Sequence, residues 1–286
     1  LIFSFDVQSK IPEPGYGLPE LASEARIKEL NSKKRAKVMT PSVQRKMQRV
    51  LEALDEAGIL EQEQALLKKE KKDKEAEAKD KEIAKAIANG QRELDDLKTR
   101  LESLQSYDRS MYYYYSAYYN LAYQEKISEA MNNYVKLVAE KDTAEKLRVN
   151  AYYVLAQLYL SESNYQSGLD YLLRWFKNTA EVNPDGYVLL GQAYYLLADK
   201  ESTKSKVLAS YQKAYNNMVE AKRLADEKQI RFRENWYSLL LASMGELDLK
   251  NEQVPVYEEI LELYPKKKYF VNLAGLYNDL DRQRDY

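Results

Sequence analysis

The sequence YYYYSAYYNLAY (residues 112–123) shows the pattern from which the fold class can be predicted. Its apolar and aromatic residues return every three or four positions, as they do along an amphipathic α-helix. Similar stretches follow downstream: AYYVLAQLY (151–159), GYVLLGQAYY (186–195), NWYSLLL (235–241) and KYFVNLAGLY (268–277). The recurrence predicts an all-α fold built from repeated helical units. It also accounts for many of the 26 tyrosines in this chain of 286 residues.

The five stretches share one position, at Ala117, Leu155, Leu190, Leu239 and Leu273. Successive spacings are 38, 35, 49 and 34 residues, which is a period near 34 with one long insertion and a slightly long first unit. That period is typical of the helix pairs of tetratricopeptide repeats. The insertion falls at residues 200–208, before a helix expected over 211–226 that could project from the array.

The residues around the shared position support this interpretation. An aromatic residue precedes it by three positions in every unit: Tyr114, Tyr152, Tyr187, Trp236 and Phe270. Small residues follow it in three units and would let two helices cross closely. The chain from about Met111 therefore resembles the tetratricopeptide repeat (TPR) family, which implies a solenoid that binds proteins or peptides and is not an enzyme. The expected units of the region 111–286 are residues 111–148, 149–183, 184–232, 233–266 and, in part, 267–286.

The first 38 residues differ from the repeats. Residues 1–38 are irregular by their proline and glycine content, apart from a short helix expected at 21–30. The basic run at 31–37 has two interpretations. One is a nucleic-acid-binding arm, and the other is a solvated linker, which the lack of interleaved aromatic residues favours.

Residues 39–110 are expected to form N-terminal helices that include a charged arm. The first helix should begin at Thr40-Pro41, a good capping pair, and stop at Gly58. Residues 61–90 contain 16 charged side chains, eight of each sign. Such alternation favours a solvated helix with weak side-chain pairs, so this stretch is an exposed helical hairpin arm or a partly mobile helix.

Composition excludes several classes of function. The chain has no cysteine and no histidine, which excludes a disulfide framework, a thiol nucleophile, imidazole ligands and a Ser-His-Asp triad. A formal net charge of -1 gives no general attraction to nucleic acid. The sequence shows no transmembrane segment, phosphate loop, metal-spaced cluster or nucleophile motif. We therefore expect no catalytic residue, no metal and no cofactor.

A partner is expected in the inner groove of the solenoid, which the first helix of each pair lines. The predicted groove residues are Tyr112, Tyr115, Tyr119, Asn150, Tyr153, Gln157, Gln192, Tyr195 and Tyr237. Tyrosine offers a rigid ring and a hydroxyl, and amides can hydrogen-bond a peptide backbone. The alternative is that most of these tyrosines are structural packing. A clamp for chaperone carboxylates is not expected, because Tyr115 and Tyr119 stand where lysine and asparagine would be wanted.

Some segments extend the resemblance to one branch of the family: ENWYSLL (234–240), LYPKKKYF (263–270), and YLLRWF (171–176) followed by NPD (183–185). They look like the periplasmic TPR proteins of Gram-negative bacteria that accompany the TonB–ExbB–ExbD energy-transducing system. The resemblance implies a periplasmic transport accessory, with its signal peptide removed, whose partners include components of that system. It also implies that the array continues beyond Tyr286, which falls inside an expected second helix.

Two other functions stay open. An uncapped repeat array exposes an apolar end, which favours self-assembly into a homo-oligomer. Alternatively, the protein is a cytoplasmic TPR adaptor whose charged arm, residues 61–90, pairs with a helix of another protein.

Overall fold

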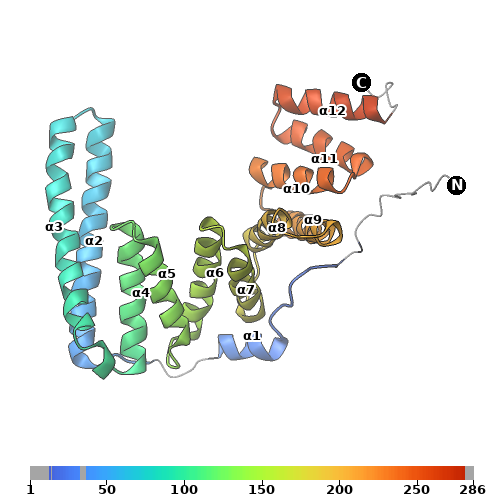
Figure 1. Cartoon of the computed structure of the whole chain (residues 1–286). Helices are drawn as coiled ribbons and strands as arrows, with labels where there is room; N and C mark the ends of the chain where they lie inside the picture. Colours follow the sequence, from blue (N-terminus) through green and yellow to red (C-terminus); the bar gives the residue numbers. More distant parts are fainter. Residues whose placement is uncertain (1–12, 14, 33–36, 281–286) are drawn as a thin grey trace. The chain divides into compact units, whose positions relative to one another are not determined.

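The computed structural model describes residue 13, residues 15–32 and residues 37–280, and these residues form an all-helical structure (Figure 1). Twelve α-helices and one short 3-10 helix make up its regular elements, and this described part contains no strand. The α-helices are α1 (Glu24–Asn31), α2 (Pro41–Lys69), α3 (Asp73–Lys98), α4 (Ser106–Ala122), α5 (Ile127–Ala139), α6 (Glu145–Ser161), α7 (Tyr165–Asn178), α8 (Pro184–Ala198), α9 (Lys204–Glu227), α10 (Glu234–Glu246), α11 (Lys250–Leu263) and α12 (Lys267–Asp279).

The chain divides into two compact units. We call residues 29–158 the arm unit, after its long helical hairpin. The described residues up to 28, together with those from 159 onward, form the other unit, which we call the strap unit after the N-terminal segment that packs on its helices. Within the residues that the structure places, no helix is both long enough and apolar enough to span a lipid bilayer.

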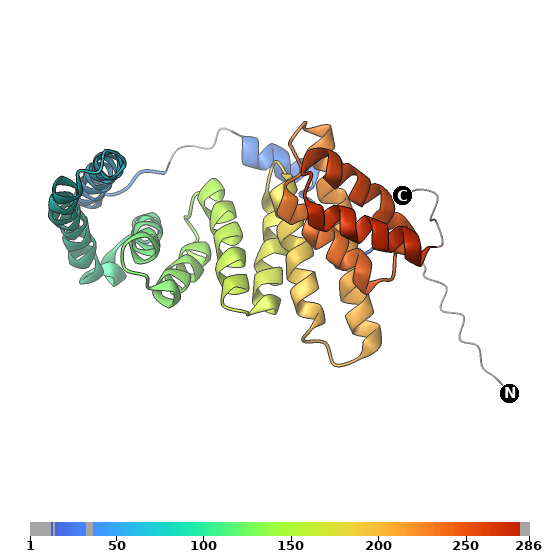
Figure 2. The same ribbon diagram turned by 90° about the horizontal axis from the view of Figure 1, so that it is seen from above.

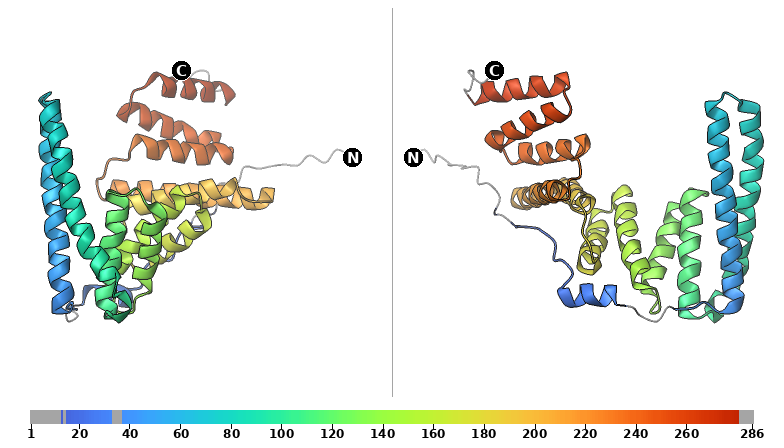
Figure 3. Two further views of the ribbon diagram at one scale, coloured as in Figure 1. Left: turned by 60° about the vertical axis from the view of Figure 1, so that its left-hand side comes forward. Right: turned by 180° about the vertical axis from the view of Figure 1, so that it is seen from behind.

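Helices α2 and α3 form a long antiparallel hairpin in the arm unit (Figure 3). The charged stretch 61–90 is thus a helical hairpin, with its turn at residues 70–72 and Lys71 in the left-handed region at φ 60°. The predicted stop at Gly58 is wrong, because α2 continues to Lys69. A mid-helix glycine costs only about 1 kcal/mol, and pairing of α2 with α3 offsets this cost.

The predicted start at Thr40-Pro41 is confirmed, but the threonine acts differently from a simple cap. Its hydroxyl donates to Asp108 Oδ2 at 2.8 Å and its backbone N–H donates to Asp108 Oδ1 at 3.0 Å. Asp108 is buried in the first turn of α4. The two hydrogen bonds therefore join the start of α2 to the start of α4.

Helix α4 packs against the middle of the α2–α3 hairpin through Tyr119, which is 1% exposed. A Cβ at Gly90 of α3 would collide with the Tyr119 hydroxyl and approach Ala53 of α2. Glycine at position 90 thus leaves the room that this ring occupies. Helices α4 and α5 are joined by Arg109, whose Nε and Nη2 donate to the two carboxylate oxygens of Glu140 at 2.6 and 2.9 Å.

Helices α8 and α9 of the strap unit lie side by side in antiparallel contact (Figure 2). A Cβ at Gly191 would lie 2.9 Å from Met218 Sδ, and one at Gly186 would lie 2.5 Å from the Trp175 ring. Both glycines therefore permit close helix contacts, as the sequence predicts for Gly191, which follows the shared position; the role of Gly186 is an addition from the structure. Helix α10 packs on α9, α11 on α10, and α12 on α11.

Three details of the predicted pattern need correction. Helix α9 begins at Lys204, so half of the expected connection at 200–208 is helical, with Thr203 accepting a cap bond from Lys206 N–H. Tyr269, not Phe270, is the buried ring of α12, and Phe270 is 58% exposed. The buried face of α12 consists of Tyr269, Leu273, Leu276 and Tyr277, a spacing that turns position 270 away. In α10, Leu240 is buried while Leu239 is only half-buried.

Candidate functional site

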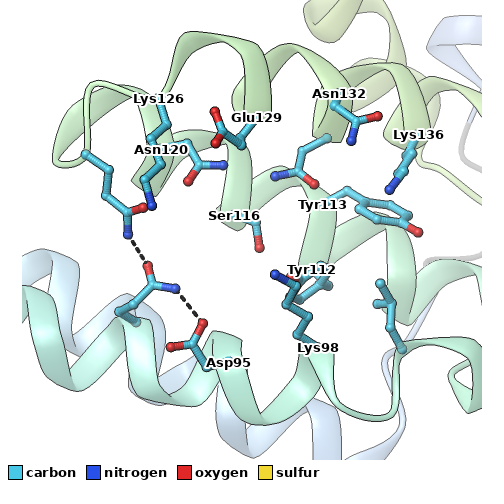
Figure 4. A pocket seen from close by; sticks show the side chains of 14 residues that line it. Asp95, Lys98, Tyr112, Tyr113, Ser116, Asn120, Lys126, Glu129, Asn132 and Lys136 are labelled. Carbon is cyan, nitrogen blue, oxygen red and sulfur yellow. Dashed lines mark hydrogen bonds between the residues drawn. The ribbon is translucent and has the colours of Figure 1, made fainter.

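A polar pocket of about 340 Å³ lies in the arm unit between α3, α4 and α5 (Figure 4). Each helix contributes residues spaced three or four positions apart, which lie on one face of the helix. These polar faces of α3, α4 and α5 all line the pocket. The lining residues are Gln91, Asp95, Lys98, Leu101, Tyr112, Tyr113, Ser116, Asn120, Gln124, Lys126, Glu129, Asn132, Asn133 and Lys136.

The buried wall of the pocket comes from α4. Tyr112, Tyr113 and Ser116 are 7%, 8% and 8% exposed, and the two rings meet edge to face at 5.6 Å between centroids. The Ser116 hydroxyl has no hydrogen-bond partner among the described residues. It lies near enough to the Tyr112 hydroxyl to influence its pKa, but the two do not meet hydrogen-bond geometry. A buried hydroxyl without a partner costs about 1–3 kcal/mol, and a ligand that bonded this atom would remove that cost.

Amide side chains form a second wall. Gln124 Nε2 donates to Gln91 Oε1 at 2.7 Å, and Gln91 Nε2 donates to Asp95 Oδ1 at 2.8 Å. This chain of hydrogen bonds connects α3 to the loop between α4 and α5 and fixes the amides at the pocket edge (Figure 4). Asn120 and Asn133 are half-buried in the lining. Each amide offers both donors and an acceptor.

Charged side chains stand at the rim, where they are exposed. Three lysines, at 98, 126 and 136, face two carboxylates, at 95 and 129, so the rim carries a formal excess of one positive charge. Lys136 Nζ lies 5.8 Å from the centroid of the Tyr113 ring, in cation–π range. The rim therefore favours a ligand that combines acidic and neutral polar groups.

The phenols of the pocket stay protonated at neutral pH. Burial raises the pKa of Tyr112, and proximity to Ser116 offsets part of that rise. Burial also raises the pKa of Tyr113, and the nearby Glu140 carboxylate adds to the effect. Both hydroxyls can thus donate a hydrogen bond as well as accept one. The pocket can hold a polar ligand by many neutral hydrogen bonds.

Among the residues that the structure describes, no cluster of three or more acidic side chains is arranged to hold a metal ion. The strongest features of the site are hydrogen-bonding groups, which suit recognition of a ligand.

Of the nine residues predicted to line a groove, only Tyr112 lies in this pocket. Tyr115 and Tyr153 are half-buried, whereas Asn150 and Gln157 are exposed on α6. In the strap unit, Gln192 is exposed, and Tyr195 is half-buried with its ring 5.2 Å from that of Tyr211. The six residues 112–157 belong to the arm unit and the other three to the strap unit.

Two of the nine are packing residues, which corrects the expectation of an open face. Tyr119 is buried against the α2–α3 hairpin, because that hairpin covers the side of α4 that the sequence pattern leaves open. Tyr237 is 0% exposed, and its hydroxyl donates to Glu259 of α11 at 2.7 Å. Burial and this carboxylate both raise the pKa of Tyr237. Neither ring can offer a face to a partner.

Sequence reasoning missed the polar residues on α3 and α5. The pair Asn132-Asn133 lies between Glu129 and Lys136 on α5, and Gln91 and Asp95 are four residues apart on α3. These spacings are visible in the sequence. Their convergence is not, because it depends on how the hairpin packs against α4.

Comparison of the chain with models of known protein families, with curated proteins and with solved structures gives no significant match.

Proposed function

We propose that the protein is a non-enzymatic scaffold that binds a polar peptide segment of another protein in the pocket between α3, α4 and α5. One observation carries the proposal: the buried Ser116 hydroxyl faces an amide-lined pocket without a hydrogen-bond partner among the described residues. A peptide supplies backbone N–H and C=O groups in close succession. It could therefore satisfy Ser116, Asn120 and Asn133 together.

The pocket walls suit this ligand. Tyr112 and Tyr113 are rigid rings with few torsions to order, which keeps the entropy cost of binding low. The two walls carry both hydrogen-bond donors and acceptors. The pocket can therefore distinguish the two directions in which an extended peptide backbone could bind. Lysines at the rim favour a peptide with an acidic side chain near the bound group.

We further propose that the helix pairs form a TPR-type solenoid. The support is that four of the five shared positions are buried, namely Ala117, Leu155, Leu190 and Leu273 at 0–9% exposure, whereas Leu239 is half-buried. Contacting helix pairs occur in both units: α4–α5 in the arm unit, and α8–α9 and α10–α11 in the strap unit. In the α8–α9 pair, Gly191 allows a close contact with Met218.

A periplasmic location and association with a TonB-type transport system extend the proposal. Their support is the resemblance of residues 171–176, 234–240 and 263–270 to periplasmic TPR proteins. Fractionation of the source cells tests the location. A protein found only in the cytoplasm, with its native N-terminus retained, would overturn this part and leave the pocket proposal intact.

Selection of peptides tests the pocket directly. A displayed library of random 12-residue peptides is panned on the full chain, and the dissociation constants of enriched peptides are then measured. We expect Ser116→Ala and Asn133→Ala each to weaken binding by about tenfold, the equivalent of one good hydrogen bond. Failure to enrich any peptide would count against the proposal.

A matched control separates pocket binding from general stickiness. Gln48 is an exposed amide on α2 whose only side-chain hydrogen bond in the described structure is to Glu52, four residues away. Gln48→Ala should leave the dissociation constant unchanged. Equal losses in Gln48→Ala and Asn133→Ala would show that the peptides do not bind in the pocket.

Self-assembly is a second candidate, and the exposed face of α12 favours it. Phe270 and Val271 are 58% and 59% exposed on adjacent positions. Sedimentation of the wild-type chain and of Phe270→Asp across micromolar concentrations tests this candidate. Self-assembly requires a concentration-dependent oligomer in the wild type that the substitution abolishes.

The charged arm favours a third candidate, a cytoplasmic adaptor. Leu66 is 59% exposed, and an open depression of about 490 Å³ at the hairpin end is lined by Leu66, Leu67 and Ala78 among charged neighbours. Another helix could pack its apolar face there. Loss of partner capture in a Leu66→Asp variant, with capture unchanged in Ser116→Ala, would favour the arm over the pocket.

A further inference from the structure

An N-terminal strap, defined as Glu13 and residues 15–22, packs on α7, α8 and α9 of the strap unit (Figure 1). Its contacts bring together residues far apart in the sequence: Tyr16 and Asn216 are 200 positions apart. The strap is extended apart from a turn at residues 15–17. Helices α7 to α9 thus already hold an extended peptide, and the chain itself supplies it.

Two adjacent asparagines of α9 hold the strap backbone. Asn216 Nδ2 donates to the carbonyl oxygens of Glu13 and Tyr16 at 3.0 and 2.9 Å. Asn217 Nδ2 donates to the carbonyl of Gly17 at 3.0 Å and also to Lys213 O within its own helix at 2.8 Å. The two side chains are 8% and 0% exposed. Buried asparagine is unfavourable inside a helix unless its amide is satisfied. Strap carbonyls accept from both Nδ2 groups, whereas Asn217 Oδ1 is buried without a hydrogen-bond partner among the described residues.

The surface formed by α8 and α9 also restricts which residue types fit at positions 16 and 17 of the strap. Gly17 has a φ of 78°, and a Cβ there would collide with Lys213 of α9. Lys213 Nζ lies 5.6 Å from the Tyr16 ring centroid and 5.3 Å from that of Tyr194 on α8. Position 17 therefore accepts only glycine, and the lysine between two rings favours an aromatic residue at position 16, whose ring is 40% exposed.

The remaining strap contacts lie along α7. Pro19 is buried. Ala22 N–H donates to Phe176 O at 3.1 Å, and Glu20 forms an exposed ion pair with Lys177 at 2.6 Å. An exposed ion pair of this kind contributes about 0–1 kcal/mol. The strap is thus held by a few hydrogen bonds, one buried proline and weak charge contacts.

We propose that the face formed by α7, α8 and α9 is a recognition site for an extended peptide with the pattern Tyr-Gly-x-Pro, and that the strap is its displaceable occupant. A segment of a partner protein with this pattern can make every contact that the strap makes. Attachment in the same chain gives the strap an effective concentration in the millimolar range. A partner segment therefore displaces it when further contacts to the partner compensate. This site is separate from the pocket between α3, α4 and α5.

The test uses the full chain and a fluorescent peptide with the sequence of residues 13–23, EPGYGLPELAS. Gly17→Ala should release the strap, because the new Cβ meets Lys213 and the backbone at φ 78° is strained. Fluorescence anisotropy should then show that the Gly17→Ala protein binds the wild-type peptide at least about tenfold more tightly than the wild-type protein does. The rate of chymotryptic cleavage after Tyr16 measures release of the strap.

Controls keep the result interpretable. Gly58→Ala, on α2 with nothing near its new Cβ, should bind the peptide no better than wild type. The same peptide carrying Gly17→Ala should bind the Gly17→Ala protein about tenfold more weakly, and this comparison needs no further change in the protein. The proposal is overturned if chymotrypsin cleaves after Tyr16 no faster in Gly17→Ala than in the wild-type protein. It is also overturned if the exposed surface binds the two peptides equally or neither of them.

Discussion

Gly90 and Tyr119 show how one residue pair fixes the packing of three helices. The missing Cβ of Gly90 makes room for the Tyr119 ring, and Ala53 closes the other side. The Tyr119 hydroxyl is buried with no hydrogen-bond partner among the described residues. The ring stabilises the fold by its packing alone, because its hydroxyl loses hydrogen bonds to water on burial and makes none to the described residues.

Gly90→Ala should therefore destabilise the protein by about 1–3 kcal/mol, the usual cost of overpacking. The better helix propensity of alanine offsets this by only about 1 kcal/mol. Denaturant unfolding measures the change. Gly58→Ala is the control, because no atom lies within 4 Å of its new Cβ, and it should stabilise by about 0.5–1 kcal/mol. Equal effects of the two substitutions would contradict the packing role of position 90.

The same ring predicts a loss of stability at alkaline pH. Burial raises the pKa of Tyr119 to about 12 from its ordinary value of 10.0. The unfolded chain loses this phenol proton first, so the stabilisation is complete below pH 10 and is lost as the pH rises toward 12. Tyr119→Phe removes the titrating group and should keep a higher free energy of unfolding than wild type at pH 11.

Gly58→Ala provides the comparison, since it removes no titrating group and no atom lies within 4 Å of its new Cβ. It should follow the wild-type pH profile. If Tyr119→Phe loses stability between pH 8 and pH 11 as steeply as wild type, burial of the phenol is not what makes the fold sensitive to base.

At the scale of elements, the pairing of α4 with α5 depends on Arg109. Its guanidinium binds both oxygens of Glu140 and also donates to Leu104 O at 2.6 Å. Burial would raise the pKa of Glu140, but hydrogen bonds from Arg109 and Ser106 outweigh it and hold the pKa below its ordinary value of 4.5. Stability from this pair is therefore present above pH 4.5 and is lost as the pH falls below it.

Arg109→Met keeps the aliphatic stem but removes the charge and all three donors. We expect it to cost about 2–3 kcal/mol at pH 7, because Glu140 is only 14% exposed and is left without its cation. The loss should shrink in acid. Arg223→Met on α9 is the matched control, since Arg223 is 58% exposed and should change stability by less than about 0.5 kcal/mol. A cost that does not depend on pH would argue against the ion pair.

The helices were predictable because aromatic and small residues recur at helical spacing, as Tyr187 and Gly191 do in α8. Other features were not predictable from local pattern. Gly58 lies inside α2 because α3 stabilises the helix beyond it, and Phe270 is exposed because Tyr269 takes the buried position. The pocket needs three helices to converge. The strap needs Asn216 to meet Tyr16 across 200 residues. Sequence spacing shows local faces, whereas both sites depend on tertiary contacts.

At the scale of the whole molecule, the two compact units predict local responses to mutation. Gly90→Ala acts on the arm unit, while Gly191→Ala presses a Cβ against Met218 and the Ala214 carbonyl in the strap unit. Hydrogen exchange should quicken mainly in α2, α3 and α4 for the first variant. For the second it should quicken mainly in α8 and α9. Uniform quickening across all helices in both variants would contradict the division into units.

The proposed function requires that the pocket between α3, α4 and α5 receives a polar peptide segment through the buried Ser116 hydroxyl. A crystal structure of the full chain with a peptide selected on it tests this binding mode. We expect a peptide backbone or side-chain polar atom about 3 Å from Ser116 Oγ, with Asn120 or Asn133 bonded to the same segment. A peptide bound elsewhere, with Ser116 Oγ still without a partner, would contradict it.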